Sequence, residues 1–207
     1  MMGGLDAVVL AGGTARRLGG ISKPDVLVAG RRLLDHVLEG ISALRASGGI
    51  PAGRTVVVAP EDVALPAGVL RALEDPPLGG PVAGIAAGLE ALAAGGGPAE
   101  AAPVTAVLTC DAPGAPAALP ALLRALRGAR AGAGADGACA RAGDRAQYLL
   151  GAYRTPALRG AVAPGGRPLR DVAVRRALGA LRVRQVTGTA EAAADLDTWE
   201  QVRAWRG

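Results

Sequence analysis

Residues 5–23 read LDAVVLAGGTARRLGGISK, and this stretch decides the fold. Its first six residues form a short, mostly apolar run that predicts a buried strand, and the glycines that follow predict a long loop. Beyond the loop, apolar residues recur at helical spacing from Leu33 to Leu44. The chain is therefore expected to begin with a strand, a loop and a helix.

Lys23, which ends this stretch, is the only lysine among the 23 lysine and arginine residues of the chain. A lysine ammonium is a compact point charge, whereas an arginine guanidinium is a planar fork, so one retained lysine indicates a need for the compact cation. Gly12 and Gly13 let the main chain approach a ligand and present its amide groups to phosphate oxygens. Together these residues predict a phosphate site, although the glycine pair alone could be an ordinary strand-to-helix turn.

The glycine-rich run matches neither of the two common phosphate-loop patterns. It is not GxGxxG, because Gly12 and Gly13 are adjacent, and it is not GxxxxGK[ST], because Ile21 and Ser22 separate Gly20 from the lysine. A dinucleotide-dependent oxidoreductase and a P-loop NTPase therefore both lose support.

The rest of the chain alternates apolar strands with helical patterns. Strands are expected at 55–59, 104–110, 147–153 and 181–186, helices at 81–94, 169–178 and from a Thr198 cap to Trp205, a strand or a helix at 69–74, and Ala/Gly-rich loops at 95–103 and 128–137. This order predicts a single-domain, Rossmann-like α/β fold over residues 1–207. We expect a mostly parallel sheet with helices on both faces.

Three of the candidate site residues follow predicted strands. Gly12 comes after the first strand, Asp75 ends the segment 69–74, and Asp111 follows the run 104–110, where prolines prevent the strand from continuing. Ligands of such sheets bind outside the carboxyl ends of the strands. One crevice is therefore expected to collect all three residues.

The composition argues against several classes of protein. The net charge is +5, but the arginines are scattered and only two Trp and two Tyr are available for stacking, so a small polyanionic substrate is favoured over nucleic acid. Cys110 and Cys139 lack CxxC spacing, which argues against a zinc site or a disulfide framework. No apolar run reaches the roughly 18 residues of a membrane span, so no membrane contact and a cytoplasmic location are expected.

The pattern Leu-Ala-Gly-Gly-x-x-x-Arg-Leu-Gly ending in Lys23, directly after the first strand, resembles the signature of nucleotidyltransferases. Within that group it most resembles the molybdenum cofactor guanylyltransferases. The resemblance extends over nearly the whole chain, through Asp75 with the motif GPVAG at 80–84, the motif CDAP at 110–113 and the motif DLDT at 195–198.

The resemblance implies roles for individual residues. It implies that the nucleotide is held by Leu10, Ala11, Gly12, Gly13, Asp75 and Asp111, that Arg17 and Lys23 contact its phosphates, and that Lys23, Arg17 and Asp111 are catalytic. It also implies that Asp111 binds Mg²⁺, or Mn²⁺ in its place. Asp195 and Asp197 are either additional metal ligands or residues that end a strand or cap a helix.

The reaction implied by the resemblance moves GMP from GTP to molybdenum-molybdopterin and releases pyrophosphate. A molybdoenzyme or an insertion chaperone would then take up the product. The alternatives are cytidylyl transfer to molybdopterin, guanylyl transfer to phospholactate, nucleotidyl transfer to a sugar phosphate, and a noncatalytic module that binds a nucleotide or a pterin.

The sequence departs from the family pattern at three places. Ser22 stands where relatives usually carry aspartate, Asp197 stands where some carry asparagine, and Gln147 with Tyr148 replaces the His-Pro of some relatives. The single histidine, His36, lies among apolar residues of the first predicted helix. It is expected to be structural.

Overall fold

The computed structural model describes residues 3–12, 22–94, 101–128, 134–189 and 191–205. A sheet of seven strands forms its centre, in the order β5-β4-β1-β6-β8-β7-β9. The strands are β1 Leu5–Leu10, β4 Thr55–Val58, β5 Leu70–Ala72, β6 Val104–Thr109, β7 Gly137–Ala142, β8 Arg145–Arg154 and β9 Val183–Val186. Every neighbouring pair is parallel except those of β8, which runs antiparallel to β6 and to β7. The predicted α/β fold with a mostly parallel sheet is confirmed.

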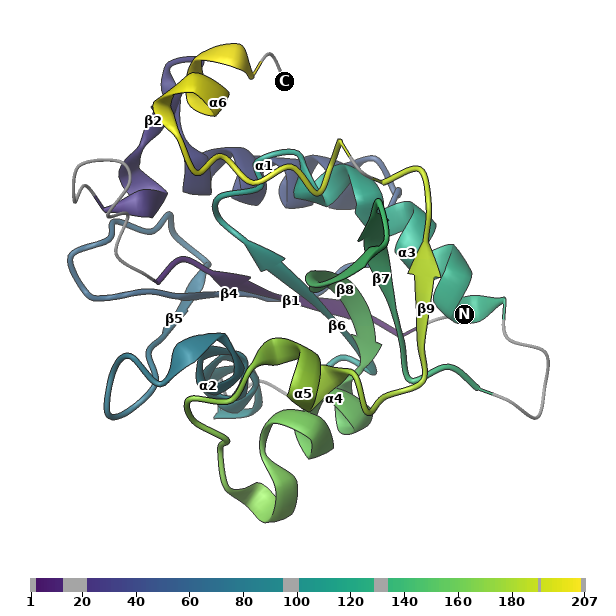
Figure 1. Ribbon diagram of the computed structural model, residues 1–207. Helices are drawn as coiled ribbons and strands as arrows, with labels where there is room; N and C mark the ends of the chain where they lie inside the picture. Colours follow the sequence, from purple (N-terminus) through teal and green to yellow (C-terminus); the bar gives the residue numbers. More distant parts are fainter. Residues whose placement is uncertain (1–2, 13–21, 95–100, 129–133, 190, 206–207) are drawn as a thin grey trace.

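Helices cover both faces of the sheet (Figure 1). The α-helices are α1 Leu33–Ala46, α2 Gly80–Ala94, α3 Leu119–Arg127, α4 Thr155–Val162, α5 Val174–Leu178 and α6 Trp199–Ala204. Figure 1 shows α1 and α3 on one face and α2, α4 and α5 on the other. The remaining elements are the hairpin of β2 Leu27–Val28 and β3 Arg31–Arg32, and the short 3₁₀ helices η2 Lys23–Asp25, η3 Ala115–Ala118 and η4 Pro164–Gly166. Within the described ranges, no helix combines the length and the apolar character that crossing a membrane requires.

The buried first strand contributes side chains to two hydrophobic clusters, because successive side chains of a strand point to opposite faces of the sheet. Leu5, Ala7 and Val9 pack into the cluster that also holds the apolar side chains of α1 and α3. Val8 points to the other face, where it packs in a cluster with Val58 and Leu92 of α2. A mostly apolar run is therefore needed, since neither face of this strand meets water. The exception, the buried carboxylate of Asp6, accepts hydrogen bonds from the N–H groups of Arg54 and Ala102.

Two glycines let α2 lie directly on the sheet. A Cβ at Gly88 would stand 2.8 Å from Val8 Cγ1, and a Cβ at Gly84 would stand 3.2 Å from Leu10 Cδ2. Both glycines are buried and are four residues apart, so they share one face of the helix. Close packing of helix on sheet explains the glycines at these positions.

The element predictions were mostly confirmed. The segment 69–74 is a strand at its centre, and Thr198 caps α6 with a full capping box. The predicted helix over 169–178 was wrong in its first half, because the backbone of Asp171 has a φ of 55° and donates to the carbonyl of Gly79. Helical structure begins only at Val174.

Several elements had not been predicted, among them the β2–β3 hairpin and the short 3₁₀ helices. The helix α3 has apolar residues at Leu119, Leu122 and Leu126, a helical spacing that was present in the sequence. The helix α4 and the strand β7 were also missed, and β7 begins at Gly137, inside the segment expected to be a loop. The parts of the two predicted loops at 95–100 and 129–133 lie outside the described residues.

We expect Gly88→Ala to destabilise the fold by about 1–3 kcal/mol, because its methyl group would collide with the stiff side chain of Val8. Gly160→Ala is the matched control, since Gly160 is an exposed helical glycine with nothing within 4 Å of an added Cβ. That substitution should stabilise the protein by up to about 1 kcal/mol. Urea unfolding of both variants measures the two effects, and equal shifts in the same direction would contradict this account of the packing.

Candidate functional site

The order of the strands reverses between β1 and β6. From β1 the chain moves outward to β4 and β5, then returns to place β6 on the other side of β1. The carboxyl ends of strands at such a reversal are where open α/β sheets bind ligands. At this edge the N–H of Ala11 donates to the carbonyl of Val58, and the N–H of Cys110 donates to the carbonyl of Leu10, both at 2.9 Å. Asp111, the next residue, is therefore delivered beside the end of β1.

The structure brings Lys23 to this edge. Its Nζ atom lies 2.6 Å from Oδ2 of Asp111 and 2.5 Å from Oδ1 of Asp197, residues that are 88 and 174 positions away in sequence. The Lys23 side chain is only 17% exposed. Three distant parts of the chain thus meet at one ammonium group.

The position of Lys23 is fixed by the turn that carries it. The guanidinium of Arg32 binds both Asp25 in η2 and Asp35 in α1, and it also donates to the carbonyl of Ala64 at 3.0 Å. Ser22, which precedes the lysine, makes no side-chain cap to η2. The turn is therefore held in place by the ion pair of Arg32 with Asp25, the last residue of η2.

The electrostatics of the group favour a charged ammonium. Burial, the largest single effect, lowers the pKa of Lys23. The hydrogen bonds that its ammonium donates to Asp111 and Asp197, together with the charges of these carboxylates, outweigh burial and raise the pKa above its ordinary value. Asp195, although open to solvent on one side, has its pKa raised to about 6 by partial desolvation and then by the nearby charges of Asp111 and Asp197. Lys23 binds two carboxylates and Asp195 lies near them as a third, so this group of residues is anionic.

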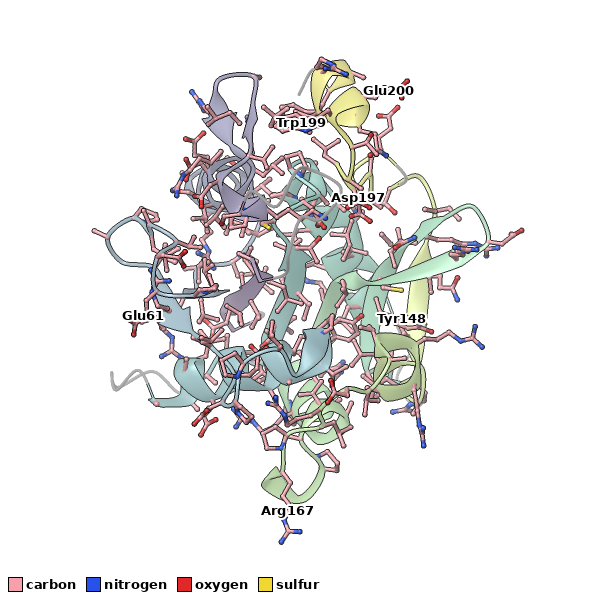
Figure 2. The ribbon with its side chains drawn as sticks, turned by 60° about the vertical axis from the view of Figure 1, so that its left-hand side comes forward. Glu61, Tyr148, Arg167, Asp197, Trp199 and Glu200 are labelled. Atoms are coloured by element: carbon pink, nitrogen blue, oxygen red, sulfur yellow. The ribbon has the colours of Figure 1, made fainter. Side chains whose placement is uncertain are left out.

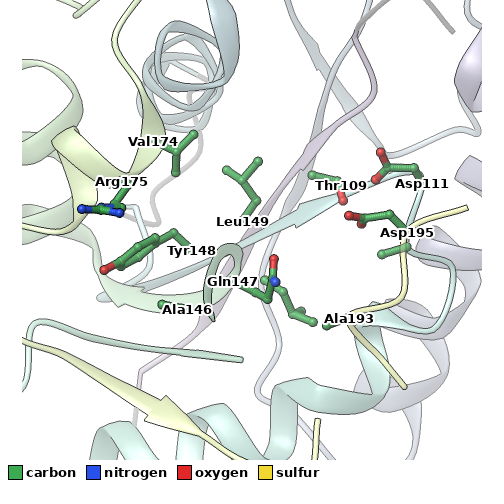
Figure 3. Close-up of a pocket in the computed structure, with 12 residues that line it drawn as sticks. Thr109, Asp111, Ala146, Gln147, Tyr148, Leu149, Val174, Arg175, Ala193 and Asp195 are labelled. Atoms are coloured by element: carbon green, nitrogen blue, oxygen red, sulfur yellow. The ribbon is translucent and has the colours of Figure 1, made fainter. Parts of the chain in front are cut away.

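A cavity of about 310 Å³ adjoins these residues. Figure 3 shows Asp111 and Asp195 at one end of it and Tyr148 and Arg175 at the other, with Gln147 between them. The residues come from the end of β6, from β8, from α5 and from the segment before α6. The cavity therefore has a carboxylate end and a cationic end.

The site suits a magnesium ion that is shared with a substrate. The Oδ1 atom of Asp111 is buried and has no hydrogen-bond partner among the described residues, so one ligand position is free. Within the described residues, no three His, Cys, Asp or Glu side chains converge closely enough to enclose a metal ion. Mg²⁺ is commonly held by one or two carboxylates together with substrate phosphates, which matches this arrangement. Asp111 would be the main protein ligand.

The other predicted nucleotide-binding residues lie at the same edge with different exposure. Leu10 ends β1 and Ala11 follows it. Gly12 is exposed, and among the described residues only the carbonyl oxygen of Val58 comes within 4 Å of an added Cβ. Asp75 is exposed in the loop after β5, two strands or roughly 10 Å from β1. Gly13 and Arg17 lie outside the described residues.

Arg175 is a candidate site residue that the sequence pattern did not indicate. Arg175 is one of the residues that line the cavity, and its side chain is exposed and makes no hydrogen bond or ion pair within the part of the chain that the structure describes. Nothing in its local sequence distinguishes it from the scattered arginines, for example Arg141, which binds Asp144, or Arg167, which points into solvent far from Asp197 (Figure 2). Only the packing of α5 against β8 brings Arg175 to the cavity.

The histidine and the cysteines stay outside the site. The Nε2 atom of His36 lies 2.9 Å from the carbonyl oxygen of Val28, and its ring packs edge-on against Trp205 at 4.7 Å, as expected of a structural histidine. Burial raises the pKa of the Cys110 thiol, and it raises that of Cys139 to about 11. Both thiols therefore stay protonated and are poor nucleophiles.

The amino-acid sequence also matches known proteins. The molybdenum cofactor guanylyltransferase of Acidiphilium cryptum (strain JF-5) is 38% identical over 99 residues, which are 45% of this chain and 45% of that relative. The molybdenum cofactor guanylyltransferase of Bradyrhizobium sp. (strain ORS 278) is 42% identical over 94 residues, 40% of this chain and 37% of the relative. The chain thus covers less than half the length of either curated relative.

A solved structure shows that the fold extends over nearly the whole chain. Molybdopterin-guanine dinucleotide biosynthesis protein A from Archaeoglobus fulgidus superposes with a TM-score of 0.58 at 20% identity, covering 95% of this chain and 94% of that one. The model of the MobA-like NTP transferase domain matches residues 7–184, from within β1 to the start of β9. The chain therefore belongs to the family of MobA-like NTP transferase domains.

Proposed function

We propose that this chain is a guanylyltransferase that moves GMP from GTP to molybdenum-molybdopterin and releases pyrophosphate. The observation that carries the proposal is the contact of Lys23 with Asp111 at the carboxyl ends of β1 and β6, beside a cavity large enough for a second substrate. The curated relatives named molybdenum cofactor guanylyltransferase support the choice of donor and acceptor.

The donor nucleotide would lie along the carboxyl end of β1. The exposed Gly12 leaves room for phosphates, and Lys23 supplies a compact cation next to them. In the reaction, an oxygen of the acceptor's phosphate attacks the α-phosphorus of GTP, and the bond to the β-phosphate breaks with its electron pair leaving on pyrophosphate. Lys23 would stabilise the charge that develops on this leaving group.

A Mg²⁺ ion bound at Asp111 would supply Lewis-acid stabilisation of the phosphate oxygens. The contribution of Asp111 itself is to offer the free Oδ1 atom at a fixed place, because its main-chain carbonyl accepts from Leu196 at 2.8 Å. The acceptor phosphate is already anionic near neutral pH. No side chain is therefore required to remove a proton, which agrees with the structural roles of His36 and the two cysteines.

The acceptor would occupy the cavity next to Asp111. Arg175 lies at the far end and its side chain has no hydrogen-bond or ion-pair partner among the described residues, and guanidinium groups bind phosphate or other oxyanions with two parallel hydrogen bonds. Gln147 and Tyr148 add an amide and an aromatic ring to the wall. These groups suit a flat heterocycle that carries an anionic substituent.

The donor and acceptor are tested with purified protein, Mg²⁺, each nucleoside triphosphate and each acceptor class: molybdenum-loaded molybdopterin, phospholactate and sugar phosphates. We expect pyrophosphate release only with GTP and the pterin, and mass spectrometry should detect the guanine dinucleotide. Turnover with CTP or a sugar phosphate instead would replace the proposed substrates. If the protein binds a nucleotide but releases no pyrophosphate with any substrate pair, the result would favour the noncatalytic binding module.

We expect Lys23→Ala and Asp111→Ala each to lower kcat on the order of 100-fold or more, because each removes electrostatic stabilisation of the transition state. Lys23→Arg should restore only part of the rate, since its planar fork does not occupy the place of an ammonium. Glu90→Ala is the control, an exposed carboxylate in the second half of α2. Near-normal turnover in both alanine variants would reject the assigned roles.

Removal of divalent metal with EDTA should abolish pyrophosphate release, and added Mg²⁺ should restore it, because the anionic group around Asp111 has a free buried oxygen for a cation. Thermal unfolding of the same samples is the control. The melting temperature should change little, since the hydrophobic core is complete without the metal. Full turnover in the presence of EDTA would contradict a metal-dependent reaction.

Arg175→Ala should raise the KM for the acceptor about tenfold or more and leave the KM for GTP nearly unchanged, because a charge-assisted contact to the acceptor is lost. Arg176→Ala is the matched control, since the neighbouring arginine is equally exposed and lines a different cavity. Steady-state kinetics with each substrate varied in turn separates the two constants. An equal effect of both substitutions would remove Arg175 from the acceptor site.

A further inference from the structure

Asp197 is held in place from both sides by its own segment of chain. On one side Leu196 is buried, and its N–H donates to the carbonyl of Asp111 at 2.8 Å. On the other side Thr198 and Gln201 form a capping box, in which Oε1 of Gln201 accepts from the N–H groups of Asp197 and Thr198, both at 2.9 Å. The backbone that carries the Asp197 carboxylate therefore has little freedom.

Lys23 is tied to the same part of the core. Three residues after it, Val26 is buried in a cluster that includes Leu33 and Leu196. The N–H of Leu33 also donates to the carbonyl of Val26 at 2.9 Å, which joins α1 to the end of η2. One hydrophobic cluster thus fixes the chain on both sides of the contact between Lys23 and Asp197.

The two carboxylates that bind Lys23 differ in what else they can hold. Asp111 uses Oδ2 on the ammonium and keeps a buried Oδ1 free, so a divalent cation would share its carboxylate with Lys23. Two cations on one carboxylate repel each other, which weakens the contact between Lys23 and Asp111. Asp197, whose side chain is 43% exposed, would then remain as the anionic partner of Lys23 that does not also bind the divalent cation.

We infer that Asp197 is a positioning residue that keeps the Lys23 ammonium beside the donor's phosphates while Asp111 carries the metal ion. The inference rests on the nucleotidyl transfer proposed above. Asp197 acts through Lys23 and is not a metal ligand. Leu196, Thr198 and Gln201 hold the backbone of Asp197, whereas Glu200 lies farther out (Figure 2).

The chain allows a direct test because it contains one lysine. Labelling with [¹³Cε]lysine gives a single side-chain signal in an NMR spectrum, and that signal belongs to Lys23. In Asp197→Asn we expect it to sharpen and move toward the position of a free lysine, and to move further when Mg²⁺ alone is added. Glu200→Gln is the control, because Glu200 is an exposed carboxylate in α6, three residues after Asp197, and this substitution should leave the signal unchanged.

Kinetics and metal binding separate a positioning role from a metal-ligand role. Asp197→Ala should lower kcat about 10- to 100-fold, the effect of losing a charge-assisted hydrogen bond. In a Lys23→Ala background the same substitution should cause no further loss. Binding of Mn²⁺, followed by the EPR signal of the free ion, should weaken in Asp111→Asn and stay within about twofold in Asp197→Ala.

Three results would overturn the inference: an unchanged lysine signal in Asp197→Asn, an undiminished effect of Asp197→Ala in the Lys23→Ala background, or loss of Mn²⁺ binding in Asp197→Ala. The NMR and EPR measurements need no turnover. If the unmodified protein releases no pyrophosphate with any substrate pair, the proposed function fails, and these two measurements still decide whether Asp197 holds Lys23.

Discussion

One ammonium group, shared between two carboxylates, joins three distant parts of this chain at the edge of its sheet. Lys23 comes from the turn after the first loop, Asp111 from the end of β6, and Asp197 from the segment before α6. A charge that is only 17% exposed requires partners, because withdrawing it from water alone would be costly. The partners it has are more negative than it can neutralise, which leaves room for a further cation.

The sheet makes this meeting possible. Parallel strands place their carboxyl ends at one edge, and the strand order reverses at β1, which is where such sheets bind ligands. The strand β1 and the residues after it differ in exposure: Leu5 to Val9 are buried beneath helices on both faces, whereas Gly12 is exposed. A stable core and an accessible phosphate site are thus separated by only a few residues.

The predictions from sequence succeeded where one local pattern had one meaning. The apolar run at 104–110 was predicted to be a strand and forms β6, and Thr198 was predicted to cap the last helix and does cap α6. They were wrong over 169–173, where the backbone binds Gly79 instead of forming a helix. That contact joins parts of the chain about ninety residues apart, so no local periodicity could report it.

The sequence by itself determined the α/β class, the glycine-rich start and the family resemblance, because strand and helix patterns and the early motif are all local. It also singled out Lys23 and Asp111, since one is unique in composition and the other ends an apolar run. Only the tertiary structure decided that Asp197 binds Lys23 and that Arg175 lines the cavity. Those placements depend on how α5 and α6 pack against elements far away in sequence, and such packing is a property of the whole core.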